Sequence, residues 1–116
     1  MVSNYKTIFE RVADGELEAE KVYEDPEIFV IKDKFPKAPV HLLIITKKVI
    51  SDLQTMAVED LPLLGKIVVV AQKMAQQFGL AEKGYRLTVN NGMNAGQTIY
   101  HLHFHLMGGG LLGEMA

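Results

Sequence analysis

The chain has no cysteine among its 116 residues, which excludes disulfides, thiolate catalysis and cysteine-ligated metal sites. No apolar run approaches the roughly 20 residues that a membrane-spanning helix needs. The first ten residues show neither the apolar centre of a signal peptide nor an Arg-rich amphipathic pattern. A net charge of −2 provides no broad basic field for a nucleic-acid backbone. We therefore expect a cytoplasmic protein that binds neither nucleic acid nor membranes.

The composition that is present is that of an ordinary globular chain, with 48% hydrophobic and 22% charged residues. A chain of 116 residues suits one hydrophobic core, so we expect a single domain over residues 1–116. There is no Walker motif and no G-x-G-x-x-G fingerprint, which argues against a P-loop or a Rossmann nucleotide site. Any nucleotide must be held in another way.

Five β-rich runs separated by turn residues predict the strands. The first two flank the turn signal Asp25-Pro26 and predict a hairpin. Together with two predicted helices they indicate an α+β fold that covers the whole chain. The runs lie at residues 21–24, 28–32, 41–46, 85–90 and 100–107.

Capping patterns and helical periodicity predict the helices. Thr7 with Glu10 has the capping-box form and opens a short helix that closes near residues 14–15. Apolar residues recur at helical spacing over residues 59–78 and predict a long helix, with a second capping-box pattern ahead of it at Ser51 and Gln54. The triplet at residues 68–70 widens the apolar surface of this helix. Either a second subunit or deep burial within one chain would account for it.

Three histidines carry the chemical signal. His101, His103 and His105 alternate with apolar residues, and on a strand this spacing points all three imidazoles to one face. An ordinary solvent-facing strand would use a mixture of polar residues there. Because the unperturbed pKa of histidine is about 6.5, such a row offers a neutral nucleophile and a proton donor at the same pH. It therefore permits a covalent phospho-histidine intermediate without a metal or another cofactor.

Two other functions stay open at this point. Imidazole is a common zinc ligand, but the first and third histidines of a strand are about 13 Å apart while Zn–N bonds are about 2 Å long. A zinc site would need a bend, or His41 as a further ligand. The second alternative is a nucleotide-binding interaction module without turnover.

The segment at residues 101–107 fits the pattern H-φ-H-φ-H-φ-φ, in which φ is apolar, and this pattern names the histidine triad family. The chain resembles the nucleotide-binding branch of that family in order and spacing from about Thr7 to Gly109. The other matching positions are Asp33, residues 36–41, Asn90, residues 96–98 and residues 108–109.

The resemblance implies a homodimer in which two five-stranded antiparallel sheets, each with one long and one short helix, join into ten strands. It also implies purine-nucleotide sites for AMP, GMP or adenosine phosphoramidate. The implied activity is hydrolysis of purine nucleoside phosphoramidates to the nucleoside monophosphate through a nucleotidyl-histidine. Aminoacyl-adenylates are family substrates as well.

The resemblance also assigns roles to residues. His103 is the expected nucleophile, and His105 is expected to contact the α-phosphate and to protonate the leaving group. His41 and His101 form the expected supporting relay, and Asp33 is expected to bind the ribose hydroxyls. Phosphate contacts are expected from the loop residues Asn90, Gly96, Gln97 and Thr98, whose amides and hydroxyl suit phosphate oxygens. The base-pocket candidates, for which core packing is an equal alternative, are Phe29, Ile31 and Val22.

Overall fold

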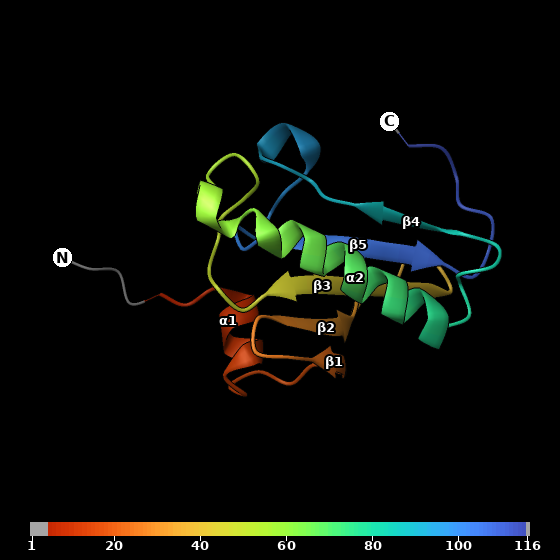
Figure 1. Ribbon diagram of the computed structural model, residues 1–116, viewed down its shortest axis with the longest axis horizontal. Coiled ribbons are helices and arrows are strands. Elements are labelled where there is room, and N and C mark those ends of the chain that lie inside the picture. Colours follow the sequence, from red (N-terminus) through yellow and green to blue (C-terminus); the bar gives the residue numbers. More distant parts are fainter. Residues whose placement is uncertain (1–4, 116) are drawn as a thin grey trace.

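The computed structural model describes residues 5–115, and its centre is one five-stranded antiparallel sheet (Figure 1). The spatial order of the strands is β1-β2-β3-β5-β4. This confirms the predicted α+β fold and the β1–β2 hairpin. The bounds are β1 (Lys21–Glu24), β2 (Ile28–Lys32), β3 (Val40–Thr46), β4 (Tyr85–Thr88) and β5 (His103–Gly108).

The long helix α2 (Pro62–Gln77) lies across one face of this sheet (Figure 1). Its apolar side packs on the strand residues that point toward it, and together they form the main core. No helix within residues 5–115 is long and apolar enough to cross a membrane. The fully buried members of this core include Ile28, Val30, Leu42, Ile44, Ile67, Val70 and Leu106.

The start of α2 differs from the second capping-box pattern. Residues 51–57 form turns, and the Asn91 side chain accepts hydrogen bonds from the amides of Leu53 (2.8 Å) and Gln54 (3.2 Å). A short 3-10 turn (Val58–Asp60) follows, and α2 begins at Pro62 without a side-chain cap. Proline suits this position because first-turn amides have no acceptor within the helix.

The short helix α1 (Ile8–Ala13) covers part of the opposite face. Its predicted capping box is present, with the Glu10 amide donating to Thr7 Oγ1 at 3.0 Å and the Thr7 amide donating to Glu10 Oε1 at 3.0 Å. The α1 side chains Phe9 and Val12 pack on a second cluster of strand residues, which consists of Phe29, Ile31, Leu43 and Ile45. Each face of the sheet therefore has its own hydrophobic cluster, one under α2 and one under α1.

Two strand ends were predicted too long. β4 ends at Thr88, and β5 begins at His103 instead of residue 100. The Leu102 amide donates to the carbonyl of Ile50 (2.6 Å), so the backbone before His103 bonds to the segment that follows β3. The residue that precedes Leu102, His101, therefore lies outside the strand ladder.

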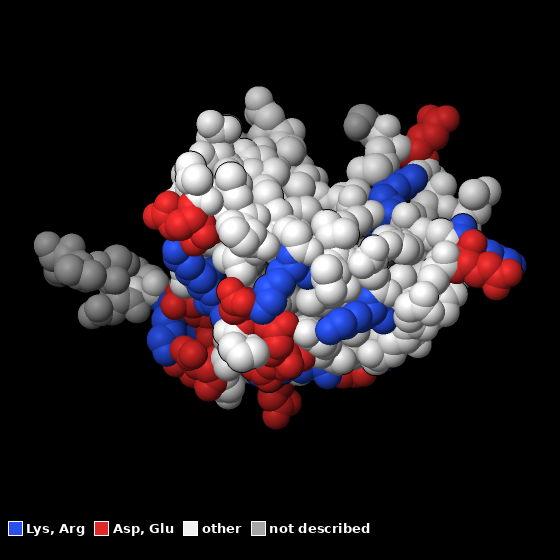
Figure 2. Space-filling model, viewed as in Figure 1, with Lys and Arg blue, Asp and Glu red and all other residues white. Residues whose placement is uncertain are grey.

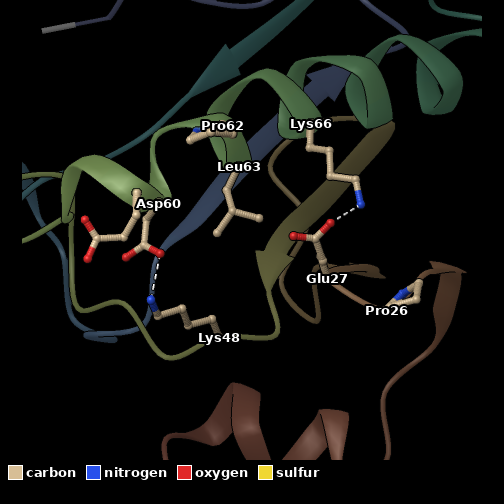
Figure 3. Close-up of a pocket in the computed structure, with 8 residues that line it drawn as sticks. Pro26, Glu27, Lys48, Asp60, Pro62, Leu63 and Lys66 are labelled. Atoms are coloured by element: carbon tan, nitrogen blue, oxygen red, sulfur yellow. Dashed lines mark hydrogen bonds and ion pairs between the residues drawn. The ribbon is translucent and has the colours of Figure 1, made fainter.

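Charged side chains of both signs alternate around the edge that carries β1, β2 and the start of α2 (Figure 2). Ion pairs there join Lys47 to Glu24 at 2.7 Å and Lys48 to Asp60 at 2.6 Å. A cavity of about 360 Å³ lies between this edge and α2, and Lys66 and Glu27 meet across it (Figure 3). No histidine lines this cavity.

Candidate active site

Pairing of β3 with β5 brings three histidines into a row on the α1 side of the sheet. His103 pairs with Ile45 and His105 with Leu43, so both rings point to the face that α1 partly covers. Their ring centroids are 5.3 Å apart. His41 enters the row from β3, with its Nε2 2.9 Å from Nδ1 of His105.

The first histidine of the motif has a different place. His101 is completely buried beneath α1, and its Nε2–H donates to the carbonyl of Thr46 at 2.6 Å. The Thr7 hydroxyl lies 2.6 Å from its Nδ1. The ring is on the same side of the sheet as the row, but it is a buried support. Of the two residues expected to form the supporting relay, His41 therefore joins His103 and His105 in the row, while His101 lies beneath α1.

Backbone groups determine which nitrogen of each ring carries the proton. His103 Nδ1 lies 2.8 Å from the carbonyl of His101, and a carbonyl only accepts, so Nδ1 carries the hydrogen. Nε2 of His103 therefore keeps a lone pair. The Lys37 amide donates to Nδ1 of His41 at 3.0 Å, so Nε2 of His41 carries the proton and donates to His105 Nδ1. His105 in turn carries its hydrogen on Nε2.

Burial keeps all four rings uncharged. It is the main cause that lowers the pKa of His41, His101 and His103 below the ordinary value. For His105, burial, together with the repulsion that the nearby rings of His103 and His41 would exert when protonated, lowers the pKa to about 4. At neutral pH the row is therefore a set of neutral imidazoles, and a neutral ring is the form that can attack phosphorus.

Asp33 stands at the end of the row, directly after β2. Its Oδ2 lies 3.3 Å from His41 Nε2, while its Oδ1 accepts the amide of Phe35 at 2.8 Å and holds the following turn. The side chain is partly buried. It is thus close to the imidazoles, and its expected contact with ribose stays a prediction.

The phosphate-loop candidates fall into two groups. Asn90 lies two positions after Thr88, the last residue of β4, which pairs with His105. Gly96 ends a short 3-10 turn with φ of 84°, a conformation that favours glycine, and Thr98 is exposed. These three can approach a ligand, and their contacts with phosphate remain predictions.

Gln97 serves the loop itself. Its side chain is buried, accepts the Gly92 amide at 2.7 Å, and donates to the carbonyls of Ser51 (2.9 Å) and Ile99 (3.2 Å). Both polar atoms of the amide group are therefore already bonded within the protein. The Gln97 side chain therefore shapes the loop, and a nucleotide contact of Gln97 through its backbone stays a prediction.

The base-pocket candidates are also divided. Phe29 and Ile31 belong to the cluster under α1, on the histidine side of the sheet. Val22 packs against the core under α2 instead. The pairing of β1 with β2 is irregular at this point, with a register shift between Lys21 and Tyr23, and both Val22 and Tyr23 pack on the α2 side. Val22 is therefore not adjacent to the histidine row.

Four groups contact the histidines, and no sequence pattern indicated these contacts. They are the Thr7 hydroxyl, the Phe9 ring, the Thr46 carbonyl and the Lys37 amide. Thr7 was recognisable only as a helix cap. Two of the others are backbone groups, which any residue at that position would offer.

Comparison with known proteins settles the family. The model of the HIT domain matches residues 14–110. The chain belongs to the HIT family. An uncharacterized HIT-like protein of Chlamydia trachomatis is 56% identical over 110 residues, which cover 95% of this chain and 98% of that protein.

Two further relatives of this HIT chain carry functional names. The purine nucleoside phosphoramidase of Escherichia coli (strain K12) is 40% identical over 110 residues, covering 95% of this chain and 92% of that protein. The crystal structure of a HIT family hydrolase from Legionella pneumophila aligns with a TM-score of 0.90 at 42% identity. That alignment covers 93% of this chain and 96% of that one.

Proposed function

We propose that this HIT protein hydrolyses purine nucleoside phosphoramidates through a nucleotidyl-histidine on His103. The observation that carries the proposal is the lone pair on His103 Nε2, which has no hydrogen-bond partner among residues 5–115. The name of the Escherichia coli relative supports the same class of substrate. Aminoacyl-adenylates, which carry the same α-phosphorus, are a second substrate class for the same attack.

In the first step His103 Nε2 bonds to the α-phosphorus and the P–N bond to the amine breaks. The amine must leave with a proton, and His105 is the ring beside the nucleophile. An anionic phosphoryl group raises the pKa of an adjacent imidazole, so binding of substrate loads His105 with a proton. For His105 to take up this proton on Nδ1, the N–H of His41 must turn away from it. Asp33 Oδ2, which lies 3.3 Å from His41 Nε2, can then accept that N–H. Water then cleaves the phospho-histidine and yields the nucleoside monophosphate.

The test is the fate of the nucleotide on the protein. Wild-type protein mixed with adenosine phosphoramidate should show a transient adenylyl adduct by intact mass, and peptide mapping should place it on His103. His103→Ala should lose more than about a thousandfold in turnover while it still binds AMP. Undiminished hydrolysis by His103→Ala would overturn the proposal. Nucleotide binding without adduct or product would favour the interaction module.

Zinc binding is the second candidate, because ligand atoms of Asp33, His41 and His105 lie within 4.8 Å of one another. The hydrogen bonds argue against it. A metal at His41 Nε2 needs the lone pair there, which places the proton on Nδ1, opposite the N–H of Lys37. Two donors would then face each other. Stoichiometric zinc in the purified protein, with activity lost on chelation, would reverse this preference.

We also propose that the protein is a homodimer. Two features of α2 and the sheet support this. Within residues 5–115, β4 has a strand neighbour on one side only, so its outer edge can pair with another copy. On α2, the neighbouring side chains of Val68 and Val69 are each 48% exposed and offer adjacent apolar surface to another copy.

A further inference from the structure

The residues that open and form α1 reach the expected nucleophile by two routes. One runs from Thr7 through the buried ring of His101 to His103. The other is the Phe9 ring, which packs edge-on against both imidazoles, with its centroid 5.0 Å from that of His103 and 5.8 Å from that of His101. We propose that Thr7 is a positioning residue that acts through His101 to fix the orientation of His103, an inference that rests on the proposed function.

The hydrogen-bond directions are determined step by step. The Glu10 amide donates to Thr7 Oγ1, so the hydroxyl keeps its own hydrogen for another acceptor. That acceptor is His101 Nδ1 at 2.6 Å, because Nε2 of the same ring must donate to the Thr46 carbonyl. Every donor in this chain meets an acceptor, and His101 is held neutral in one tautomer.

His101 is then the fixed point for the nucleophile. Its carbonyl accepts the Nδ1–H of His103 at 2.8 Å, which turns the lone pair of His103 to Nε2. A ring bonded at both nitrogens and completely buried cannot rotate without breaking two hydrogen bonds. The position of that carbonyl therefore depends on Thr7 as well as on the Leu102–Ile50 backbone hydrogen bond that follows it.

This role differs from helix capping. A cap requires only an acceptor oxygen, and aspartate serves as well as serine or threonine. Support of His101 requires a hydroxyl hydrogen, which aspartate lacks when ionised. Aspartate would instead draw a proton onto His101 Nδ1 and change its charge. The two roles can thus be separated at one position.

The experiment compares Thr7→Ser, Thr7→Asp and Thr7→Val with wild type in single-turnover adduct formation from adenosine phosphoramidate. Serine should retain the rate within about twofold. Aspartate and valine should each slow adduct formation about tenfold, equivalent to about 1.4 kcal/mol in the barrier, with the Kd for AMP changed less than about twofold. Glu10→Ala is the matched control, because it removes the other half of the capping box and leaves the Thr7 hydroxyl in place.

If Thr7 served only as a helix cap, the variants would group differently. Aspartate would then behave like serine, and Glu10→Ala would behave like valine; either result overturns the inference. Nitrogen-15 spectra of wild-type imidazoles provide a test that needs no variant. They should show hydrogen on Nε2 of His101 and on Nδ1 of His103, and hydrogen on Nδ1 of His101 would refute the proposal.

These experiments distinguish a failure of the inference about Thr7 from a failure of the proposed function. If His103→Ala is inactive and Thr7→Asp is as fast as wild type, only the inference about Thr7 fails. If His103→Ala retains full activity, the proposed function fails whatever the Thr7 variants do. In that case the imidazole spectra still report whether Thr7 holds His101 in its tautomer.

Discussion

Replacement of His101 by leucine should destabilise the protein strongly. Leucine has slightly more volume than histidine, so the substitution leaves no cavity of consequence. The main cost comes from two polar groups that lose their partner, the Thr46 carbonyl and the Thr7 hydroxyl, each 2.6 Å from a ring nitrogen. An unsatisfied buried group costs about 1–3 kcal/mol. We expect His101→Leu to lower the free energy of unfolding by about 2–4 kcal/mol, a large share of the usual 5–15 kcal/mol.

The assay is urea unfolding near neutral pH at one protein concentration, since dimerisation would couple stability to concentration. The same substitution in a Thr7→Val background should cost about half as much, because only the Thr46 carbonyl is then newly orphaned. His101→Gln, whose amide can donate to Thr46 and accept from Thr7, should recover part of the loss. A cost for His101→Leu below about 1 kcal/mol, or an identical cost in both backgrounds, would refute the hydrogen-bond account.

Two further predictions concern the row and the dimer. Since the pKa of His105 is lowered to about 4, the unfolded chain binds more protons below about pH 6.5, and stability should fall between that pH and about 4. His105→Asn should reduce this pH dependence of the unfolding free energy. Nuclear magnetic resonance should show a His105 pKa near 4 that rises when AMP binds. Equal unfolding free energies at about pH 6.5 and about pH 4 would contradict the expectation. Val68→Asp should convert the proposed dimer to a monomer, as measured by sedimentation, because apolar surface would then cover a charge; an unchanged mass would contradict an interface at Val68.

Strand and helix types followed from local patterns, and so did the faces of the strands. The alternation around His103 and His105 sets their side of the sheet whatever packs there, because a one-residue shift would bury the rings under α2. The capping box at Thr7 and Glu10 is likewise local. The predicted strand bounds were wrong where the backbone forms hydrogen bonds with a segment distant in the sequence. The backbone at Leu102 bonds to Ile50, so β5 starts later than its composition suggests.

For two candidate site residues, too, the surrounding fold determines where the side chain lies. Val22 is apolar and lies in the first strand, but the face to which it points depends on how β1 pairs with β2. Gln97 has a side chain that could bind phosphate, yet the loop that it belongs to bonds it at both ends. Residue type indicates what a side chain can bind, and only the surrounding fold determines whether a ligand or the protein occupies it.

The protons on the histidines are the feature furthest from the sequence. Lys37 donates through its amide to His41, and Thr46 accepts through its carbonyl from His101, so no side-chain pattern could have revealed either contact. Yet these backbone groups decide the chemistry. The Lys37 amide, acting through His41, leaves a hydrogen on Nε2 of His105, and the carbonyl of His101 leaves a lone pair on Nε2 of His103; the centroids of these two rings are 5.3 Å apart. A nucleophile beside a donor is what displacement at phosphorus requires, and a change of one tautomer would remove it without altering a single residue of the motif.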